Sequence, residues 1–198
     1  MAATKTTPAR FHGLLLETAP RLVFTPRPAT ERLVDAALVR LGPLAGAARV
    51  ADVGTGTGAI AVSLAVRLPE LEVWATETQA PALALARRNV EAHGLGGRVH
   101  VLAADLLEGV PTGLELVVAN LPYLPPEAAI RFPDEPREAV VSDGDGLAHY
   151  RRLLAFAGDR LAPGGGVLLQ FHGEVLEAER SELHWLETRL EALARAAA

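Results

Sequence analysis

The chain has 198 residues, 49% of them hydrophobic, and is long enough to form one domain around a buried core. Its net charge of −5 argues against a broad phosphate-binding face, and the lack of cysteine excludes disulfide bonds and thiolate metal sites. No apolar run is long enough to span a membrane, and the polar start, Met1 to Pro8, differs from a signal peptide. These features predict a cytoplasmic protein without a membrane partner.

Thermolabile side chains are rare. The sequence contains two Asn, two Gln and one Met, and Lys5 is its only lysine. This composition suits a thermophile, although a GC-rich genome would favour it as well.

Residues 1–10 are expected to form a flexible tail, and residues 11–198 a single domain. Residues 14–16 and 21–24 predict a short hairpin or arm. Thr30 is the expected N-cap of a helix over residues 30–41, because apolar residues recur there at helical spacing. Further helices are expected at 57–68, 79–93 and 146–162, and strands at 48–53, 71–76, 98–103, 114–119 and 166–171. This alternation predicts an α/β fold with a doubly wound, mostly parallel sheet.

The segment from Asp52 to Ile60 has glycine at every second position, where a strand turns into a helix. Glycine lets the backbone approach a ligand closely, and the start of a helix presents free N–H groups. The dinucleotide pattern is not matched, because Ala59 stands at its third glycine, and no Gly-Lys-Ser/Thr follows. Alone the glycine loop is weak evidence for a ligand site, since many strand-to-helix turns carry glycine for steric reasons.

Polar residues also follow the next three strands. Glu77 ends the second strand, about twenty residues past the glycine loop, where a carboxylate can bind two ribose hydroxyls. Asp105 follows the third strand and is placed to accept from the exocyclic amine of adenine. Singly, each carboxylate is better explained as a helix cap or a solvated loop residue. Because ligands bind at the carboxyl ends of parallel strands, all the strand ends together predict a ligand pocket.

The fourth strand is followed by Asn120-Leu121-Pro122-Tyr123, which is suited to hold a planar NH2 group. The Asn120 side-chain oxygen accepts one N–H and the Leu121 carbonyl accepts the other. Pro122 stiffens the turn, and Tyr123 offers a ring for stacking. An ordinary Asn-Pro turn is the alternative for the tetrapeptide alone.

On these residues the chain resembles a class I S-adenosylmethionine-dependent methyltransferase, and more narrowly the HemK/PrmC-type protein-(glutamine-N5) methyltransferases. The resemblance covers about residues 11–171. Residues 23–31, Val-Phe-Thr-Pro-Arg-Pro-Ala-Thr-Glu, are similar to the family's Pro-Arg-Pro-Glu-Thr-Glu segment, and residues 120–123 stand where it has Asn-Pro-Pro-Tyr. Residues 135–153 follow its Glu-Pro-x-x-Ala-Leu and Asp-Gly-Leu-x-x-Tyr stretch, which is more family-specific than the glycine loop.

The resemblance implies a Rossmann-like fold, S-adenosylmethionine as cofactor, and a glutamine in a protein such as a release factor or ribosomal protein as methyl acceptor. The implied cofactor-binding residues are Asp52, Gly54, Thr55, Gly56, Thr57, Gly58, Glu77, Asp105, Leu106 and Asn120. The implied catalytic residues are Asn120, Leu121, Pro122 and Tyr123. The implied substrate contacts are Phe24, Pro26, Arg27, Thr30 and Tyr123.

The chain departs from this family at both ends. The family has a helical N-terminal domain that engages the release factor, for which this sequence leaves no room, and two more strands after the fifth. We find no β-rich segment after Phe171 and expect a charged helix over residues 174–198. The sheet would then lack its last strands, and the helix, a second copy of the chain or another partner would cover its edge. His172 departs from the family's Glu-x-Gly.

Residues 124–146 are rich in Pro, Asp, Glu and Gly without a clear period, and we interpret them as a lid over the site rather than a disordered insert. The six histidines form no metal pattern, and Asp143 and Asp145 lack the rest of a calcium loop.

Two other functions stay open. Asn-Leu-Pro-Tyr is also similar to the motif of rRNA adenine-N6 dimethyltransferases, so adenine N6 in RNA or DNA is an alternative acceptor. Such an enzyme should gather arginine at the cleft mouth, where Arg27, Arg131 and Arg137 are the obvious candidates. A non-catalytic cofactor-binding remnant is the other alternative; the missing domain and strands favour it, and the intact motif residues oppose it.

Overall fold

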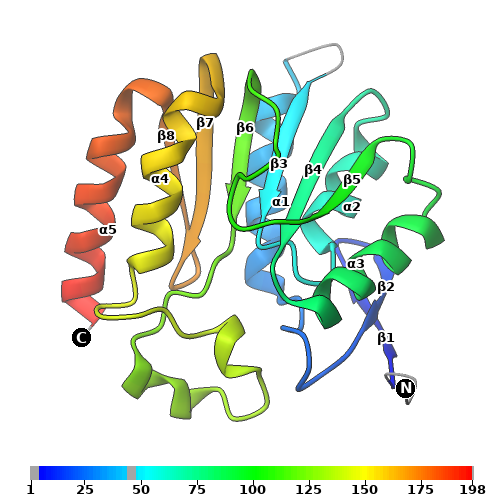
Figure 1. Ribbon diagram of the computed structural model, residues 1–198, viewed down its shortest axis with the longest axis horizontal. Coiled ribbons are helices and arrows are strands. Elements are labelled where there is room, and N and C mark those ends of the chain that lie inside the picture. Colours follow the sequence, from blue (N-terminus) through cyan, green and yellow to red (C-terminus); the bar gives the residue numbers. More distant parts are fainter. Residues whose placement is uncertain (1–4, 44–47, 198) are drawn as a thin grey trace.

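A six-stranded sheet with helices on both faces forms the centre of the molecule, and a two-stranded hairpin lies beside it (Figure 1). The computed structural model describes residues 5–43 and 48–197. Its strands are β1 (Thr7–Phe11), β2 (Leu14–Thr18), β3 (Arg49–Val53), β4 (Glu72–Glu77), β5 (Val99–Ala103), β6 (Leu114–Ala119), β7 (Leu161–Phe171) and β8 (Glu174–Glu179). Its α-helices are α1 (Pro28–Leu41), α2 (Ala59–Arg67), α3 (Ala80–Ala92), α4 (Ala148–Arg160) and α5 (Leu183–Ala197). Short 3-10 helices are η1 (Pro126–Arg131), η2 (Arg137–Ala139) and η3 (Arg180–Glu182).

The strand order in the sheet is β5-β4-β3-β6-β7-β8. The first five strands are parallel, and β8 runs antiparallel to β7. The chain builds outward from β3 to β5 and then returns to the other side of β3 with β6, so the order reverses between β3 and β6. Ligands bind at such a reversal in open parallel sheets. The expected α/β fold with a mostly parallel, doubly wound sheet is confirmed.

Each face of the sheet has its own hydrophobic cluster. On one face, Leu33 of α1 and Leu64 of α2 are fully buried against strand residues such as Val50. On the other face, Leu153 of α4 and Leu186 of α5 belong to a second cluster with the remaining strand side chains. Strand residues therefore alternate between two apolar environments, which explains why the central strands read as nearly continuous hydrophobic runs. Among the described residues, no helix is both long and apolar enough to cross a membrane.

The expectation of one helix from residue 174 to 198 is wrong. Residues Glu174–Glu179 form β8, and α5 begins only at Leu183. Leu176 and Ala178 are buried while the glutamates between and beside them are exposed, which is the alternation of a strand with one face in the core. Glu, Leu and Ala are strong helix formers, so local propensity pointed to helix, and pairing with β7 overrides it. Exposed glutamates on this outer strand discourage further pairing at the edge.

The N-terminal expectations also need correction. Thr7–Phe11 is strand β1 rather than part of a tail, and it pairs with β2 instead of residues 21–24; residues 1–4 lie outside the described part. His12 and Gly13 both have positive φ, of 48° and 79°, as a two-residue hairpin turn requires. Helix α1 starts at Pro28 with Arg27 as its N-cap, so Thr30 lies in the first turn and is not the cap. Proline suits this start because its fixed φ is already helical.

The lid, defined here as residues 124–146, contains η1 and η2 and lies below the carboxyl ends of the central strands (Figure 1). Backbone hydrogen bonds close its two ends. Leu124 N–H donates to Val140 O and Ser142 N–H donates to Leu124 O, both at 2.9 Å. The segment is therefore ordered by its own backbone bonds and is not a disordered insert.

Gly146, the last residue of the lid, packs directly against the backbone of Tyr123 and Pro125 at its start. Its φ is +88°, and a Cβ at this position would stand 2.3 Å from the carbonyl oxygen of Tyr123. Real Cβ atoms do not approach backbone that closely, so only glycine fits. This contact gives the Asp-Gly-Leu stretch a physical purpose, because it fixes the backbone of the Asn120–Tyr123 turn.

We expect Gly146→Ala to lower the free energy of unfolding by more than about 2 kcal/mol, from the steric clash and the left-handed backbone together. Gly144→Ala is the matched control. Its φ is +63°, but a Cβ there meets nothing within 4 Å, so it should cost only about 1 kcal/mol. Urea unfolding measures both values. Equal losses in the two variants would show that the contact with Tyr123 is unimportant.

Candidate functional site

A cavity of about 540 Å³ lies between the carboxyl ends of the strands, the lid and the segment before α1. Most of the site residues expected from the sequence line it. These are Phe24, Pro26, Arg27, Thr30, Gly54, Thr55, Gly56, Thr57, Glu77, Asp105, Leu106, Asn120, Leu121, Pro122 and Tyr123. Asp52 and Gly58 do not line the cavity. The strand ends thus meet at one pocket, as parallel pairing requires.

The glycine loop runs along one wall of the cavity. Gly54, Gly56 and Gly58 have φ of +70°, +58° and +80°, so all three use the left-handed backbone that favours glycine. Gly54 N–H and Thr55 N–H both donate to the carbonyl of Thr76, at 3.0 and 2.9 Å, which ties the loop to β4. Gly58 ends the loop and is the N-cap of α2.

Glu77 at the end of β4 is nearly buried and bonds to backbone amides. Its Oε2 accepts from Gly56 N–H at 3.0 Å, and its Oε1 accepts from Thr78 and Gln79 N–H, each at 2.9 Å. An ionised carboxylate offers about four acceptor positions. The three amides occupy three of them, which leaves a position for a ligand in the cavity. The carboxylate is held rigidly and retains room for a ribose hydroxyl.

Asp52 supports the loop from inside the core. It is fully buried, and its Oδ2 accepts from Thr55 Oγ1 at 2.6 Å and from Ala61 N–H at 3.0 Å. Its Oδ1 has no hydrogen-bond partner among the described residues. Burial raises the pKa of Asp52 to about 6, against the lowering effect of the two hydrogen bonds. Asp52 thus holds the loop through Thr55 and Ala61, and it does not itself line the cavity.

Asp105 faces the cavity but is already paired. Arg152 Nη2 lies 2.5 Å from its Oδ2, and both side chains are partly exposed. One carboxylate oxygen remains for another donor such as an adenine amine. The next residue, Leu106, is buried and takes a positive φ of 48°, so the backbone turns sharply at this wall of the cavity.

Asn120 has a defined orientation. Its Nδ2 donates to Thr30 Oγ1 at 3.2 Å, a contact between residues 90 positions apart in sequence. With its nitrogen held by α1, the planar amide presents Oδ1 on the opposite branch, as an acceptor for a ligand. Thr30 is itself buried, with an exposed fraction of 5%. It is thus a positioning partner of Asn120.

The Leu121 carbonyl remains available as an acceptor. The hydroxyl of the buried Tyr150 lies 3.4 Å from it and 2.5 Å from the carbonyl of Gln170. A phenol carries one proton, and the shorter contact takes it. The Leu121 carbonyl is therefore left with at most a weak internal partner. Burial raises the pKa of Tyr150 well above its ordinary value, so the hydroxyl stays protonated.

Arg27 joins the lid to the segment before α1. Its guanidinium lies over the rings of Phe24 and Phe132, with 5.3 and 5.2 Å to the centroids. It also donates to Glu135 Oε1 at 2.8 Å, and Glu135 Oε2 accepts from Thr25 N–H at 3.2 Å. The Glu135 side chain is only 6% exposed, so this pair is partly desolvated. Arg27 is engaged with the lid.

Sequence reasoning missed several residues of the site. Glu135, Gln170 and Tyr150 are not among the site residues predicted from the sequence. Asn89, which resembles the family's residue near the end of helix α3, is not among them either, although its side chain accepts from Glu17 N–H and donates to the carbonyls of Glu17 and Thr57. This joins the hairpin, α3 and the glycine loop. The scarcity of amide side chains was the one available signal for Asn89 and Gln170.

The residues present fit a nucleoside-bearing cofactor. The cavity combines open glycine backbone, the rigid carboxylate of Glu77 and an apolar wall, and Leu121 and Leu106 belong to the buried apolar set. No group of three or more His, Asp or Glu suited to a metal ion occurs within residues 5–43 and 48–197.

We expect the stability of the fold to depend on pH through Asp52. Folded Asp52 keeps its proton up to about pH 6, whereas its ordinary pKa is 3.8. Between these values the folded state binds more protons than the unfolded state, so the contribution of Asp52 to stability falls as pH rises. At about 1.4 kcal/mol per pKa unit, the fall approaches about 3 kcal/mol at neutral pH.

Asp52→Asn resembles the protonated residue and should lack this dependence. Its free energy of unfolding relative to the wild type should therefore increase between pH 4 and pH 7. Urea unfolding at both pH values checks this. A difference between the two proteins that is independent of pH would show that Asp52 ionises normally in the fold.

The model of the Methyltransferase small domain family matches residues 30–135 of this chain. The release factor glutamine methyltransferase of Bordetella pertussis is 44% identical over 169 residues, which cover 81% of this chain and 61% of that protein. The enzyme of the same name from Gloeobacter violaceus is 40% identical and is matched over 82% of this chain and 58% of its own length. The chain thus spans about three-fifths of the length of these curated relatives.

Solved structures show the same fold. The 16S rRNA methyltransferase RsmC of T. thermophilus, determined with AdoMet and guanosine, gives a TM-score of 0.60 at 24% identity and covers 83% of this chain and 41% of that chain. A ribosomal protein methylase of Lactobacillus delbrueckii gives 0.53 at 22% identity, with coverage of 75% and 62%. The family match includes the glycine loop, Glu77, Asp105 and the Asn120–Tyr123 turn. This chain therefore belongs to the Methyltransferase small domain family and has the Rossmann-like fold of class I methyltransferases.

Proposed function

We propose that this chain transfers a methyl group from S-adenosylmethionine to the side-chain nitrogen of a glutamine in a protein. The observation that carries the proposal is the orientation of Asn120, which lines the cavity and whose Nδ2 is held by Thr30, so that Oδ1 is left as the acceptor for a ligand. The curated relatives named release factor glutamine methyltransferase support the same acceptor.

When bound, S-adenosylmethionine supplies an electrophilic methyl group on a sulfonium sulfur. Transfer would form the N–C bond as the S–C bond breaks, release S-adenosylhomocysteine and leave one N–H proton to pass to water afterwards, so the chain has to align the nitrogen lone pair opposite the S–C bond. Asn120 Oδ1 and the Leu121 carbonyl accept the two N–H bonds of the acceptor, and they stabilise the positive charge that develops on nitrogen. No general base is needed before the transfer.

Tyr123 forms the aromatic wall beside these acceptors. Its ring packs against Phe171 and His172, with centroid distances of 5.2 and 5.0 Å. Burial raises the pKa of the Tyr123 hydroxyl, so the ring remains neutral and can stack on a planar amide. The bulk of Leu121, which stands where the family has proline, leaves its carbonyl in place.

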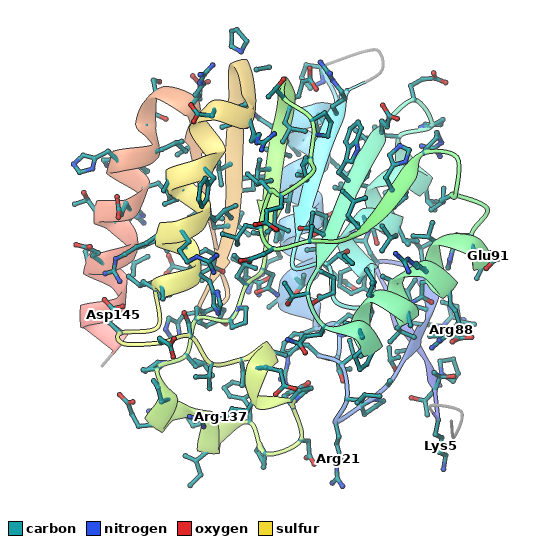
Figure 2. All side chains as sticks on the ribbon, in the orientation of Figure 1. Lys5, Arg21, Arg88, Glu91, Arg137 and Asp145 are labelled. Carbon is teal, nitrogen blue, oxygen red and sulfur yellow. The ribbon has the colours of Figure 1, made fainter. Side chains whose placement is uncertain are left out.

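The pairing of Arg27, which lines the cavity, supports a protein substrate over RNA or DNA. Arg27 is paired with Glu135, and Arg21 is paired with Asp134 at 2.8 Å. Figure 2 shows Arg21 pointing outward from the molecule and Arg137 on the lid. A nucleic-acid site would need arginines free to contact phosphates, and Arg27 is already matched by a carboxylate, whereas Arg131 and Arg137 form no ion pair with the described residues.

The partner in this proposal is a protein with an exposed glutamine, such as a release factor or a ribosomal protein. Such a partner places the chain in the cytoplasm, where translation occurs. We also propose a thermophilic source, which the scarcity of Asn, Gln and Met supports, although a GC-rich genome would favour the same composition.

The test is transfer of a radiolabelled methyl group from S-adenosylmethionine to a cell lysate, followed by protease or nuclease treatment. We expect the label to be lost on protease treatment and kept on nuclease treatment, and its amino-acid product to be N-methylglutamine. Label that is sensitive to nuclease would instead support adenine as the acceptor. No transfer by folded protein would support the non-catalytic alternative.

Asn120→Ala should lower the rate of transfer by about a hundredfold or more, because one acceptor for the developing charge is lost. Its affinity for S-adenosylmethionine, measured by calorimetry, should stay nearly unchanged and serves as the control for folding. Wild-type activity in this variant would refute the catalytic role.

A further inference from the structure

Gln170, the penultimate residue of β7, lines the cavity at the level of the acceptor motif. The parallel register pairs Ala119 with Leu169, so the next residues, Asn120 and Gln170, leave the pairing side by side on adjacent strands. Adjacent strands lie about 4.8 Å apart, which is close enough for both side chains to contact one small group.

Both side chains belong to the same face of the sheet. Side chains two residues apart on a strand share a face, and Leu168 and Val118 both lie in the cluster covered by α1 and α2. Gln170 follows Leu168 by two positions. Asn120 follows Val118 by two positions and reaches Thr30 of α1, which confirms its direction. The cavity therefore has two carboxamides on one side.

Packing does not explain a glutamine at this position. The residue is only 4% exposed, and its Oε1 has no hydrogen-bond partner among the described residues. Its neighbours on β7, Val167 to Leu169 and Phe171, are all apolar and buried. An apolar side chain of similar size would fill the space without leaving a buried polar atom unpaired.

The fold uses only the backbone of Gln170. Its carbonyl accepts from the Tyr150 hydroxyl at 2.5 Å, and its backbone pairs with Val175 of β8. Any residue at position 170 would provide both interactions. The carboxamide itself is therefore free for a ligand.

We propose that Gln170 binds the carbonyl oxygen of the substrate's carboxamide, an inference that rests on the proposed glutamine acceptor. A carboxamide carries its oxygen and its NH2 group on opposite branches, so a buried Oε1 turns Nε2 toward the cavity. Asn120 Oδ1 and the Leu121 carbonyl accept hydrogen bonds and serve the substrate's NH2. Neither can donate to its carbonyl oxygen, and Gln170 Nε2 supplies that donor.

This bond differs from those of Asn120 in its effect on the reaction. The substrate carbonyl exists before and during methyl transfer, and its oxygen becomes less negative as the nitrogen lone pair leaves amide resonance, so Gln170 stabilises the bound substrate at least as much as the transition state. Loss of the bond should therefore raise KM and change kcat little.

Gln170→Met preserves the volume and removes the donor. We expect KM for the protein substrate to rise about tenfold, kcat to change less than twofold, and cofactor affinity to stay the same. The midpoint of thermal unfolding should equal or exceed that of the wild type, because an unpaired buried oxygen is removed. An unchanged KM would overturn the proposal, as would a large drop in the unfolding midpoint together with lost cofactor affinity.

Ser63→Ala is the matched control. Ser63 lies on α2, is fully buried, and its Oγ also lacks a partner among the described residues, but it does not line the cavity. Removing this unpaired atom should leave KM and kcat unchanged. A rise in KM equal to that of Gln170→Met would mean that buried polar atoms act on the site through packing.

Side-chain NMR gives a readout that does not depend on turnover. The chain has only four side-chain amides, from Asn89, Asn120, Gln79 and Gln170. In protein saturated with S-adenosylhomocysteine, a glutamine-containing pentapeptide should shift the Gln170 NH2 resonances, and the same peptide with methionine should not. The Asn89 resonances should not move with either peptide.

The outcomes separate the two proposals. If glutamine is methylated and Gln170 stays unshifted, the role of Gln170 is refuted and the proposed function stands. If wild-type protein methylates no glutamine and the peptide shifts no amide, both fail.

Discussion

The parallel pairing of β3 with β6 is the constraint on which the site depends. Its register places Val53 opposite Ala119, so Gly54 and Asn120 leave the sheet at the same level. The contact between the two loops is close, since a Cβ on Gly54 would stand 2.6 Å from Leu121 Cδ2. A residue larger than glycine at position 54 would push the Asn120–Tyr123 turn away from the glycine loop. The strand reversal thus brings the glycine loop and the Asn120–Tyr123 turn together at one edge of the sheet.

Residues 27–31, at the start of α1, bond to the other segments around the cavity. Each of its polar side chains reaches a different part of the chain: Arg27 bonds to Glu135 of the lid, Thr30 to Asn120, and Glu31 to the His12 N–H in the hairpin turn at 2.7 Å. Because these bonds come from the N-cap and the first turn of one helix, the lid, the Asn120 amide and the hairpin are held in fixed positions relative to one another. This gives a physical reason for the order Pro-Arg-Pro-Ala-Thr-Glu at residues 26–31 of this chain.

The strand ends could be predicted from the sequence because parallel topology alone brings Gly54, Glu77 and Asn120 to one edge. The partners of these residues could not, since Thr30 with Asn120 and Arg27 with Glu135 are about a hundred positions apart and depend on how α1 and the lid dock. Strand β8 was misread because its residues are good helix formers, and its period-2 pattern matters only once β7 is beside it. The opening position of Asp52 in the loop motif predicts a cofactor contact, but its burial and its bonds to Thr55 and Ala61 depend on the packing of the folded loop and could not be predicted from the sequence.

Calorimetric titration of S-adenosylmethionine into the wild-type chain tests most directly whether the β3–β6 junction forms a cofactor site. One site per chain with a dissociation constant in the micromolar range is the predicted result, because Glu77 and the glycine loop are already rigid before the ligand binds. Absence of binding heat at several temperatures, by protein whose circular dichroism shows an intact fold, would contradict it.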